Sequence, residues 1–231
     1  MLRLTNPICV ALDSRDPDRV ASVAAATEPH VGMFKVGLTT YVAFGSYLTA
    51  SLAARLPVFL DLKLHDIPAQ VAGAVRSVAA TGASLVTIHA SGGAEMIRAA
   101  VDAAGDVTVL AVTVLTSMDD PALTEIGMTG PTEKAVLTLA ELAISNGAHG
   151  LVCSPLEVEA IRARFGPQAE GGPLLVVPGI RPPGSDRGDQ RRTLTPGQAL
   201  AAGADVLVIG RPITGSDDPA RAAASLAQEL T

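Results

Sequence analysis

Short apolar runs recur along the chain at fairly regular intervals. Each consists mostly of Val, Ile and Leu, and continuous apolar runs of this length are typical of parallel strands that are buried on both faces. The sequence therefore predicts eight strands, within residues 7–13, 33–38, 58–64, 85–90, 108–115, 150–155, 174–180 and 205–213.

Ala-rich stretches that are long enough for helices separate these runs, most clearly at 40–56, 92–105, 132–147 and 155–166. Glycines follow several of the helical stretches, as expected at helix C-termini: Gly82, Gly105, Gly147, Gly166 and Gly203. Eight strands alternating with eight helical segments predict an α/β fold, a (β/α)8 TIM barrel, as a single domain over residues 1–231. An open doubly wound sheet is the alternative, but it usually has a Gly-rich phosphate turn after its first strand, where this chain has ALDSRDPDRV.

Composition limits the classes of partner. With 48% hydrophobic and 17% charged residues the chain can bury a large core, and its net charge of −6 argues against a nucleic-acid-binding surface. We see no signal peptide and no apolar run as long as a membrane span, so we expect a cytoplasmic protein without a membrane partner. Cys9 and Cys153 lie in apolar runs without zinc-ligand spacing, which favours buried thiols.

The segment FLDLKLHDIP, residues 59–68, places charged residues in an apolar strand. Burying charge is costly unless each charge has a partner. Asp61 and Lys63 are two residues apart and project from one strand face, and the C-terminal strand ends of a barrel form its active site. With Asp13 and Lys35 from the first two strands they form a row of alternating sign. Lys63 should remain a cation and can act as a general acid, although an ion-pair network that only seals the barrel mouth is the alternative.

A phosphate site is expected at the other side of the barrel mouth. VIGRP places Gly210 and Arg211 at the end of the last strand, where barrels frequently bind phosphate. Within the irregular segment 181–197, the loop 181–191, which contains Gln190, could close over a ligand as a lid. The alternatives are that Arg211 pairs with a surface carboxylate and that 181–191 is a disordered surface loop. We interpret His65 and His89 as structural, with His89 hydrogen-bonded at the pocket floor.

Taken together, these motifs resemble those of the bacterial orotidine 5'-phosphate decarboxylases. The resemblance spans nearly the whole chain, and the combination is highly specific although each motif alone is weak. The matching segments are VALD (10–13), FKVG (34–37), DLKLHDIP (61–68), TVLTSM (113–118), VPGIRPPGSDRGDQRR (177–192) and VIGRP (208–212).

The resemblance implies a role for each matching residue. Asp13 would hold the ribose, and the catalytic Lys35 would bridge the ribose and the carboxylate row. Asp61 and Lys63 would form the core of the catalytic array, in which Lys63 protonates C6 of the pyrimidine. Asp66 would reach the active site of a second subunit in a homodimer. The implied substrate contacts further include Ile67, Gln70, Thr116, Ser117, Pro178, Arg181, Gln190, Gly210 and Arg211. At Gln70 the family usually has Thr, so that contact departs from the pattern.

The reaction that the resemblance implies converts orotidine 5'-monophosphate to UMP in pyrimidine biosynthesis, without a cofactor. Related sugar-phosphate decarboxylases and aldolases share the DxKxxD strand, but they bind Mg²⁺ through a Glu near the position of Lys35. A lysine there argues for a fixed cation and no metal ligand. A non-catalytic barrel that binds nucleotide phosphate is a further alternative, although it would not need the row of alternating charges.

Overall fold

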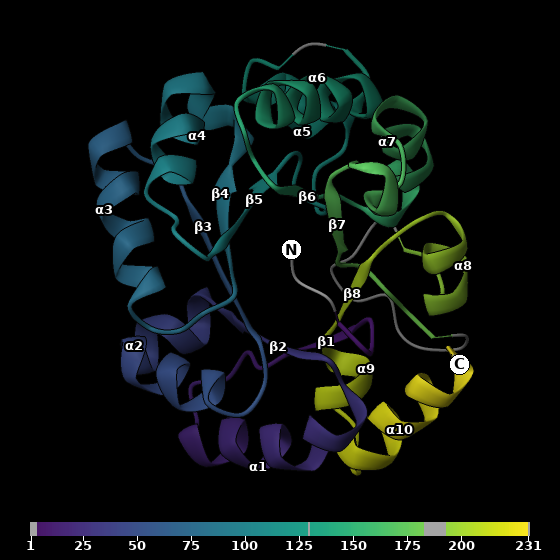
Figure 1. Cartoon of the computed structure of the whole chain (residues 1–231). Coiled ribbons are helices and arrows are strands. Elements are labelled where there is room, and N and C mark those ends of the chain that lie inside the picture. The colour runs from purple at the N-terminus through teal and green to yellow at the C-terminus, as the bar shows by residue number, and fades with distance from the viewer. Residues whose placement is uncertain (1–3, 129, 183–192, 231) are drawn as a thin grey trace.

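The computed structural model describes residues 4–128, 130–182 and 193–230. Within them, eight parallel strands close into a barrel that is surrounded by helices (Figure 1). The strands are β1 (Ile8–Ala11), β2 (Met33–Gly37), β3 (Val58–Leu64), β4 (Leu85–His89), β5 (Thr108–Val112), β6 (Gly150–Val152), β7 (Leu174–Val177) and β8 (Val206–Ile209).

Each strand pairs with the next one along the chain, and β1 pairs with β8. The closing pair aligns Ile8 with Leu207 and Val10 with Ile209. An open doubly wound sheet has two edges and no such pair. The predicted (β/α)8 TIM barrel is therefore confirmed, and each of the eight strands lies within a predicted apolar run.

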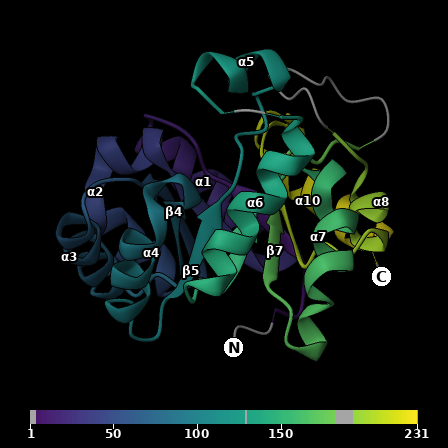
Figure 2. The same cartoon turned by 90° about the horizontal axis from the view of Figure 1, so that it is seen from above.

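Helices cover the outside of the barrel, as Figure 1 shows. The described residues contain α1 (Pro17–Thr27), α2 (Leu38–Ala53), α3 (Pro68–Ala79), α4 (Gly93–Asp102), α5 (Asp120–Glu125), α6 (Thr132–Ser145), α7 (Val158–Phe165), α8 (Pro196–Ala201), α9 (Arg211–Thr214) and α10 (Pro219–Glu229). The short helices α5 and α9 are additions to the predicted pattern. Figure 2 shows α5 standing away from the ring of helices, in the connection between β5 and α6.

The glycines at the helix ends have the backbone conformation that favours glycine. Gly82, Gly105, Gly147, Gly166 and Gly203 all have φ values between 56° and 108°. A residue with a Cβ atom is strained in this region, so the glycines allow the chain to leave each helix and turn toward the next strand. Another glycine, Gly45 (φ 66°), interrupts α2 with a kink.

The core has two layers, one inside the barrel and one between strands and helices. Successive strand residues point to opposite faces, so Cys9 and Ala11 of β1 face inward while Ile8 and Val10 pack against helices. The inner layer consists largely of Val and Leu and fills the lower part of the barrel. Side chains nearer the C-terminal strand ends are polar, and this change of polarity positions the site.

The segment after β7 is partly outside the described residues, because 183–192 are not described. The predicted irregular stretch 181–197 ends earlier than expected, since α8 begins at Pro196. Thr195 caps this helix, and its side chain accepts a hydrogen bond from the backbone N–H of Gln198. Ile180 and Leu194 form an isolated parallel bridge across the segment. Among the described residues, no helix combines the length and apolar character needed to cross a membrane.

Candidate active site

A pocket of about 630 Å³ opens at the C-terminal ends of the strands. This volume is in the range of small-molecule sites. Phe59, Val112 and Val208 contribute an apolar wall from inside the barrel. The predicted site residues that line the pocket are Asp13, Lys35, Asp61, Lys63, Thr116, Ser117, Pro178, Arg181, Gly210 and Arg211.

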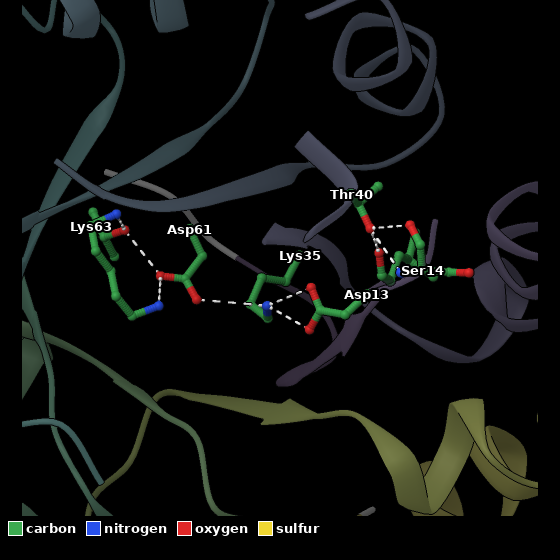
Figure 3. A network of polar contacts seen from close by, with 8 residues as sticks. Asp13, Ser14, Lys35, Thr40, Asp61 and Lys63 are labelled. Carbon is green, nitrogen blue, oxygen red and sulfur yellow. Dashed lines mark hydrogen bonds and ion pairs between the residues drawn. The ribbon is translucent and has the colours of Figure 1, made fainter. Parts of the chain in front are cut away.

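Four charged side chains of alternating sign form a row along one side of this pocket (Figure 3). The Lys35 Nζ atom lies 3.0 Å from Asp13 Oδ2 and 3.6 Å from Asp61 Oδ2. The other oxygen of Asp61, Oδ1, accepts a hydrogen bond of 2.8 Å from Lys63 Nζ. Each charge therefore has an opposite neighbour, which lowers the cost of removing the row from water.

The row fixes the charge states of its two most buried members. Burial by itself lowers the pKa of Lys35, but the carboxylates of Asp61 and Asp13 outweigh burial and raise the pKa above its ordinary value. Burial likewise favours the neutral form of Asp61, yet Lys35 and Lys63 hold its pKa below the usual range. At neutral pH Lys35 is a cation and Asp61 an anion.

Two further residues hold Asp13 in place. The hydroxyl of Thr40, which is fully buried, donates to the Leu12 carbonyl at 2.6 Å and accepts from the Ser14 backbone N–H at 2.9 Å (Figure 3). The loop that carries Asp13 is thereby tied to the first turn of α2. Gly37, at the end of β2, leaves room for the ion pair, because a Cβ atom there would lie 2.4 Å from Asp13 Oδ1.

Basic residues occupy the side of the pocket formed after β7 and β8. Gly210 follows β8, and Arg211 comes next as the first residue of α9. Arg181 follows the bridge residue Ile180 and donates a hydrogen bond from Nη1 to the Ile180 carbonyl. Together the two arginines place positive charge in the lining of the pocket, which suits an anionic ligand group.

The geometry agrees with what sequence comparison finds. A model of the orotidine 5'-phosphate decarboxylase / HUMPS family matches residues 6–226. The chain belongs to this family. It is 56% identical over 226 residues to the orotidine 5'-phosphate decarboxylase of Anaeromyxobacter sp. (strain K), covering 96% of this chain and 97% of that protein. The corresponding protein of Thermobifida fusca is 53% identical, covering 97% and 95%.

Solved structures show the same family fold. The crystal structure of orotidine 5'-phosphate decarboxylase from Lactobacillus acidophilus superimposes with a TM-score of 0.85 at 34% identity, covering 98% of this chain and 99% of that chain. An uncharacterized conserved protein from Geobacillus kaustophilus superimposes with a TM-score of 0.83 at 35% identity, covering 97% and 100%. The family resemblance read from the motifs is thus confirmed over nearly the full length.

Three described residues that the family resemblance singles out do not line this pocket. Asp66, Ile67 and Gln70 are exposed, on the turn after β3 and in the first turn of α3. Asp66 Oδ1 accepts the backbone N–H of its neighbour Ile67 at 2.6 Å. Gln190, predicted in the lid, lies outside the described residues. The roles of all four stay predictions.

The two histidines beside the site differ from expectation. His89 was expected to hydrogen-bond at the pocket floor, but it is not among the residues that line the pocket. Its ring lies 5.5 Å, centroid to centroid, from the ring of His65. Burial, followed by the nearby His65 and Lys63, lowers the pKa of His89. His89 therefore favours its neutral form more than an ordinary histidine does, with its ring beside that of His65.

Sequence reasoning missed Thr87 and the backbone shape of β3. Thr87 is fully buried in β4, and its hydroxyl lies 3.0 Å from Asp61 Oδ1. Lys63 was expected in a regular strand, but it has φ 52°, and the β3–β4 register shifts between Leu60 and Leu64. A Thr within LVTIHA looks like an ordinary β-branched strand residue, so no sequence signal distinguishes it.

Proposed function

We propose that this chain decarboxylates orotidine 5'-monophosphate to UMP in pyrimidine biosynthesis. The observation that carries the proposal is the row Asp13–Lys35–Asp61–Lys63 in the wall of the pocket. The names of the relatives from Anaeromyxobacter and Thermobifida supply the substrate. A barrel that only bound nucleotide phosphate would have no use for two carboxylates and two ammonium groups at this position.

The chemical step needs a proton donor and an electrostatic field. The bond between C6 and the carboxylate carbon breaks, CO2 departs, and the electron pair stays on C6. Lys63 then transfers a proton from its ammonium group to C6, which forms the C6–H bond of UMP, and recovers a proton from water. The charge on C6 develops beside a preorganised cation, which stabilises the transition state more than the ground state.

The charge states of the row support this mechanism. Asp61 stays ionised because Lys35 and Lys63 outweigh the effect of burial on its pKa. Its negative charge opposes the substrate carboxylate, and loss of CO2 relieves that repulsion. Lys35 is only 7% exposed and is held between Asp13 and Asp61, so it keeps both carboxylates in place while Asp13 contacts the ribose.

The rest of the pocket is proposed to hold the phosphate and the base of the substrate. Gly210 and Arg211 would hold the phosphate, with Arg181 and the undescribed Gln190 closing over it. Thr116 and Ser117, after β5, would contact the base beside Pro178. Binding energy from the phosphate, far from C6, can then stabilise the transition state at the reacting carbon.

We further propose a homodimer in which Asp66 serves the partner's site. Support comes from large apolar side chains that a monomer leaves exposed: Leu38 (53% exposed), Val42 (80%) and Tyr47 (86%) of α2 and Ile67 (64%). Gly37 of β2 pairs with Asp61 of β3, so the turns that follow these two strands lie at one edge of the barrel mouth. Exposed apolar side chains near this edge, among them Ile67 next to Asp66, suit a second copy that buries them.

We also propose that the chain works without a metal ion. The sugar-phosphate decarboxylases and aldolases considered above have a metal ligand near this position, where the chain has the fixed cation of Lys35. Among the described residues, no group of three or more His, Cys, Asp or Glu is arranged to hold a metal ion. The electrostatic role of a divalent ion would fall to Lys35 and Lys63.

The barrel is proposed to be a single domain over residues 1–231, which the pairing of β1 with β8 supports. A cytoplasmic location follows from the proposed substrate, because a nucleotide phosphate does not cross a bilayer unaided.

Purified protein and orotidine 5'-monophosphate test the function directly, by loss of orotate absorbance. Turnover that is unchanged by EDTA is expected. Turnover that EDTA abolishes and Mg²⁺ restores would contradict the metal-free mechanism, and no turnover with or without Mg²⁺ would reject the decarboxylase.

Mixing an Asp66→Asn variant with a Lys63→Ala variant tests the dimer. If active sites are shared, re-assorted dimers regain one intact site, and failure to regain activity under exchanging conditions would contradict the shared site.

A further inference from the structure

Thr87 occupies an unusual position in the barrel. It lies in β4, fully buried, opposite the part of β3 that carries the catalytic pair. Regular pairing on either side of it joins Leu60 with Val86 and Leu64 with Ile88. Residues 61–63 of β3 therefore face a single residue of β4. The extra residues of this bulge cannot all pair with the neighbouring backbone.

The bulge leaves the backbone of Lys63 in need of a partner. Lys63 has φ 52°, and among the described residues it is the only non-glycine residue with positive φ. Its N–H donates to Thr87 Oγ1 at 2.8 Å, so a side chain replaces the missing strand partner. A left-handed lysine persists only where its surroundings fix it.

The direction of the second hydrogen bond of Thr87 follows from its partner, because the ionised carboxylate of Asp61 only accepts. The hydroxyl accepts from the Lys63 N–H, and its single hydrogen is left to donate to Asp61 Oδ1 at 3.0 Å. The same oxygen accepts from Lys63 Nζ at 2.8 Å. One hydroxyl therefore ties the backbone of Lys63 to the carboxylate that holds its ammonium group.

We propose that Thr87 is a positioning residue of the active site, which sets the place of Lys63 Nζ relative to C6 through the backbone of Lys63 and the carboxylate of Asp61. It does not line the pocket, so it acts on substrate only through these two residues. The proposal rests on the proposed decarboxylase function. Thr87 should matter for the proton transfer and hardly at all for binding of UMP.

Thr87→Val tests this with a side chain of similar shape that has no hydroxyl. We expect kcat to fall roughly 10- to 100-fold, because a misplacement of about 1 Å at a reacting group has an effect of this size. The dissociation constant of UMP should stay within about threefold of the wild-type value. Thr87→Ser keeps the hydroxyl and should retain most of kcat, which a role in packing alone would not predict.

Thr27→Val is the matched control. Thr27 is also fully buried, but its hydroxyl donates to Val23 within α1, far from the row, so kcat should not change. An inactive wild type would overturn the proposed function. An active wild type together with a Thr87→Val variant of near wild-type kcat would overturn only the role of Thr87.

The Ser and Ala variants decide the matter if Thr87→Val does not fold. Both remove the γ-methyl group of Thr87, and only Ser keeps the hydroxyl. A kcat that is retained in Thr87→Ser and reduced at least about tenfold in Thr87→Ala supports the proposal. Equal kcat in both, or a Thr87→Ala variant that is also unfolded while Thr87→Ser is native, would assign Thr87 to stability and overturn the positioning role.

Discussion

Replacing Gly37 tests whether catalytic activity depends on the observed geometry of the ion pair between Asp13 and Lys35. It lies where β2 ends and α2 begins. In Gly37→Ala the new Cβ atom would lie 2.4 Å from Asp13 Oδ1 and 2.8 Å from Lys35 Nζ. Both atoms end flexible side chains, and the backbone at Gly37 has φ −94°, which alanine adopts freely. The ion pair should therefore move while the barrel stays intact.

The size of the effect follows from these distances. Ordinary contacts begin at 3.4 Å, so Asp13 Oδ1 must retreat by about 1 Å. If Asp13 holds the ribose as proposed, a shift of this size costs about 100-fold in kcat/KM, or about 2.7 kcal/mol of transition-state stabilisation. The Asp13 side chain is 44% exposed, so its ion pair contributes less than about 1 kcal/mol to the free energy of unfolding.

The assay combines initial rates of orotidine 5'-monophosphate decarboxylation with thermal unfolding. Gly197→Ala is the control, because Gly197 is exposed in α8, has no left-handed φ and has open space for a Cβ atom. A Gly37→Ala variant within about threefold of wild-type kcat/KM would refute the reasoning. A loss of several kcal/mol of stability would also refute it, since it would place the defect in the backbone.

Three further predictions concern single residues. Lys63→Ala should lower kcat by roughly 10⁴-fold while UMP still binds by calorimetry; near-normal turnover would exclude Lys63 as the proton donor. The pKa of Asp61 is depressed, so its contribution to stability is complete above the unfolded pKa of about 3.9 and is lost as pH falls through the lower folded value. Urea unfolding of Asp61→Asn should therefore depend less steeply on pH below about 4 than that of the wild type, and equal slopes would contradict the depressed pKa. Burial raises the pKa of the Cys9 thiol, so in a Cys153→Ser background iodoacetamide should label Cys9 only after unfolding; rapid labelling of native protein would be the contrary result.

The barrel was predictable because its strands are buried on both faces. Continuous Val, Ile and Leu runs alternate with helical stretches, and the count of eight is sufficient for closure. The helices α5 and α9 were not predictable in the same way. At six and four residues, they are too short to show an amphipathic period, and only local signals such as the capping Asp119 before α5 mark them.

The row of charges was predictable because barrels carry their active sites at the C-terminal strand ends. The threonines that hold the row in place were not predictable. Asp13 ends an apolar run, Lys35 and Asp61 lie within the next two runs, and neighbouring parallel strands bring such residues together. Thr40 and Thr87 act through hydroxyl groups whose partners depend on register and loop path. A single sequence does not distinguish a threonine that positions a carboxylate from one that fills a strand.

The charged residues of β3 are tolerated because the strand is irregular where they occur. If β3 were regular, each residue from 58 to 64 would pair with the backbone of β4. No side chain could then bond to the backbone of β3 between the two strands. The shift in register admits the Thr87 hydroxyl, which satisfies both the Lys63 N–H and one oxygen of Asp61. A left-handed non-glycine residue costs about 1–2 kcal/mol, and these hydrogen bonds offset that cost. The strain therefore lies at the residue that the proposed mechanism makes the proton donor, and stored backbone strain clusters at functional sites.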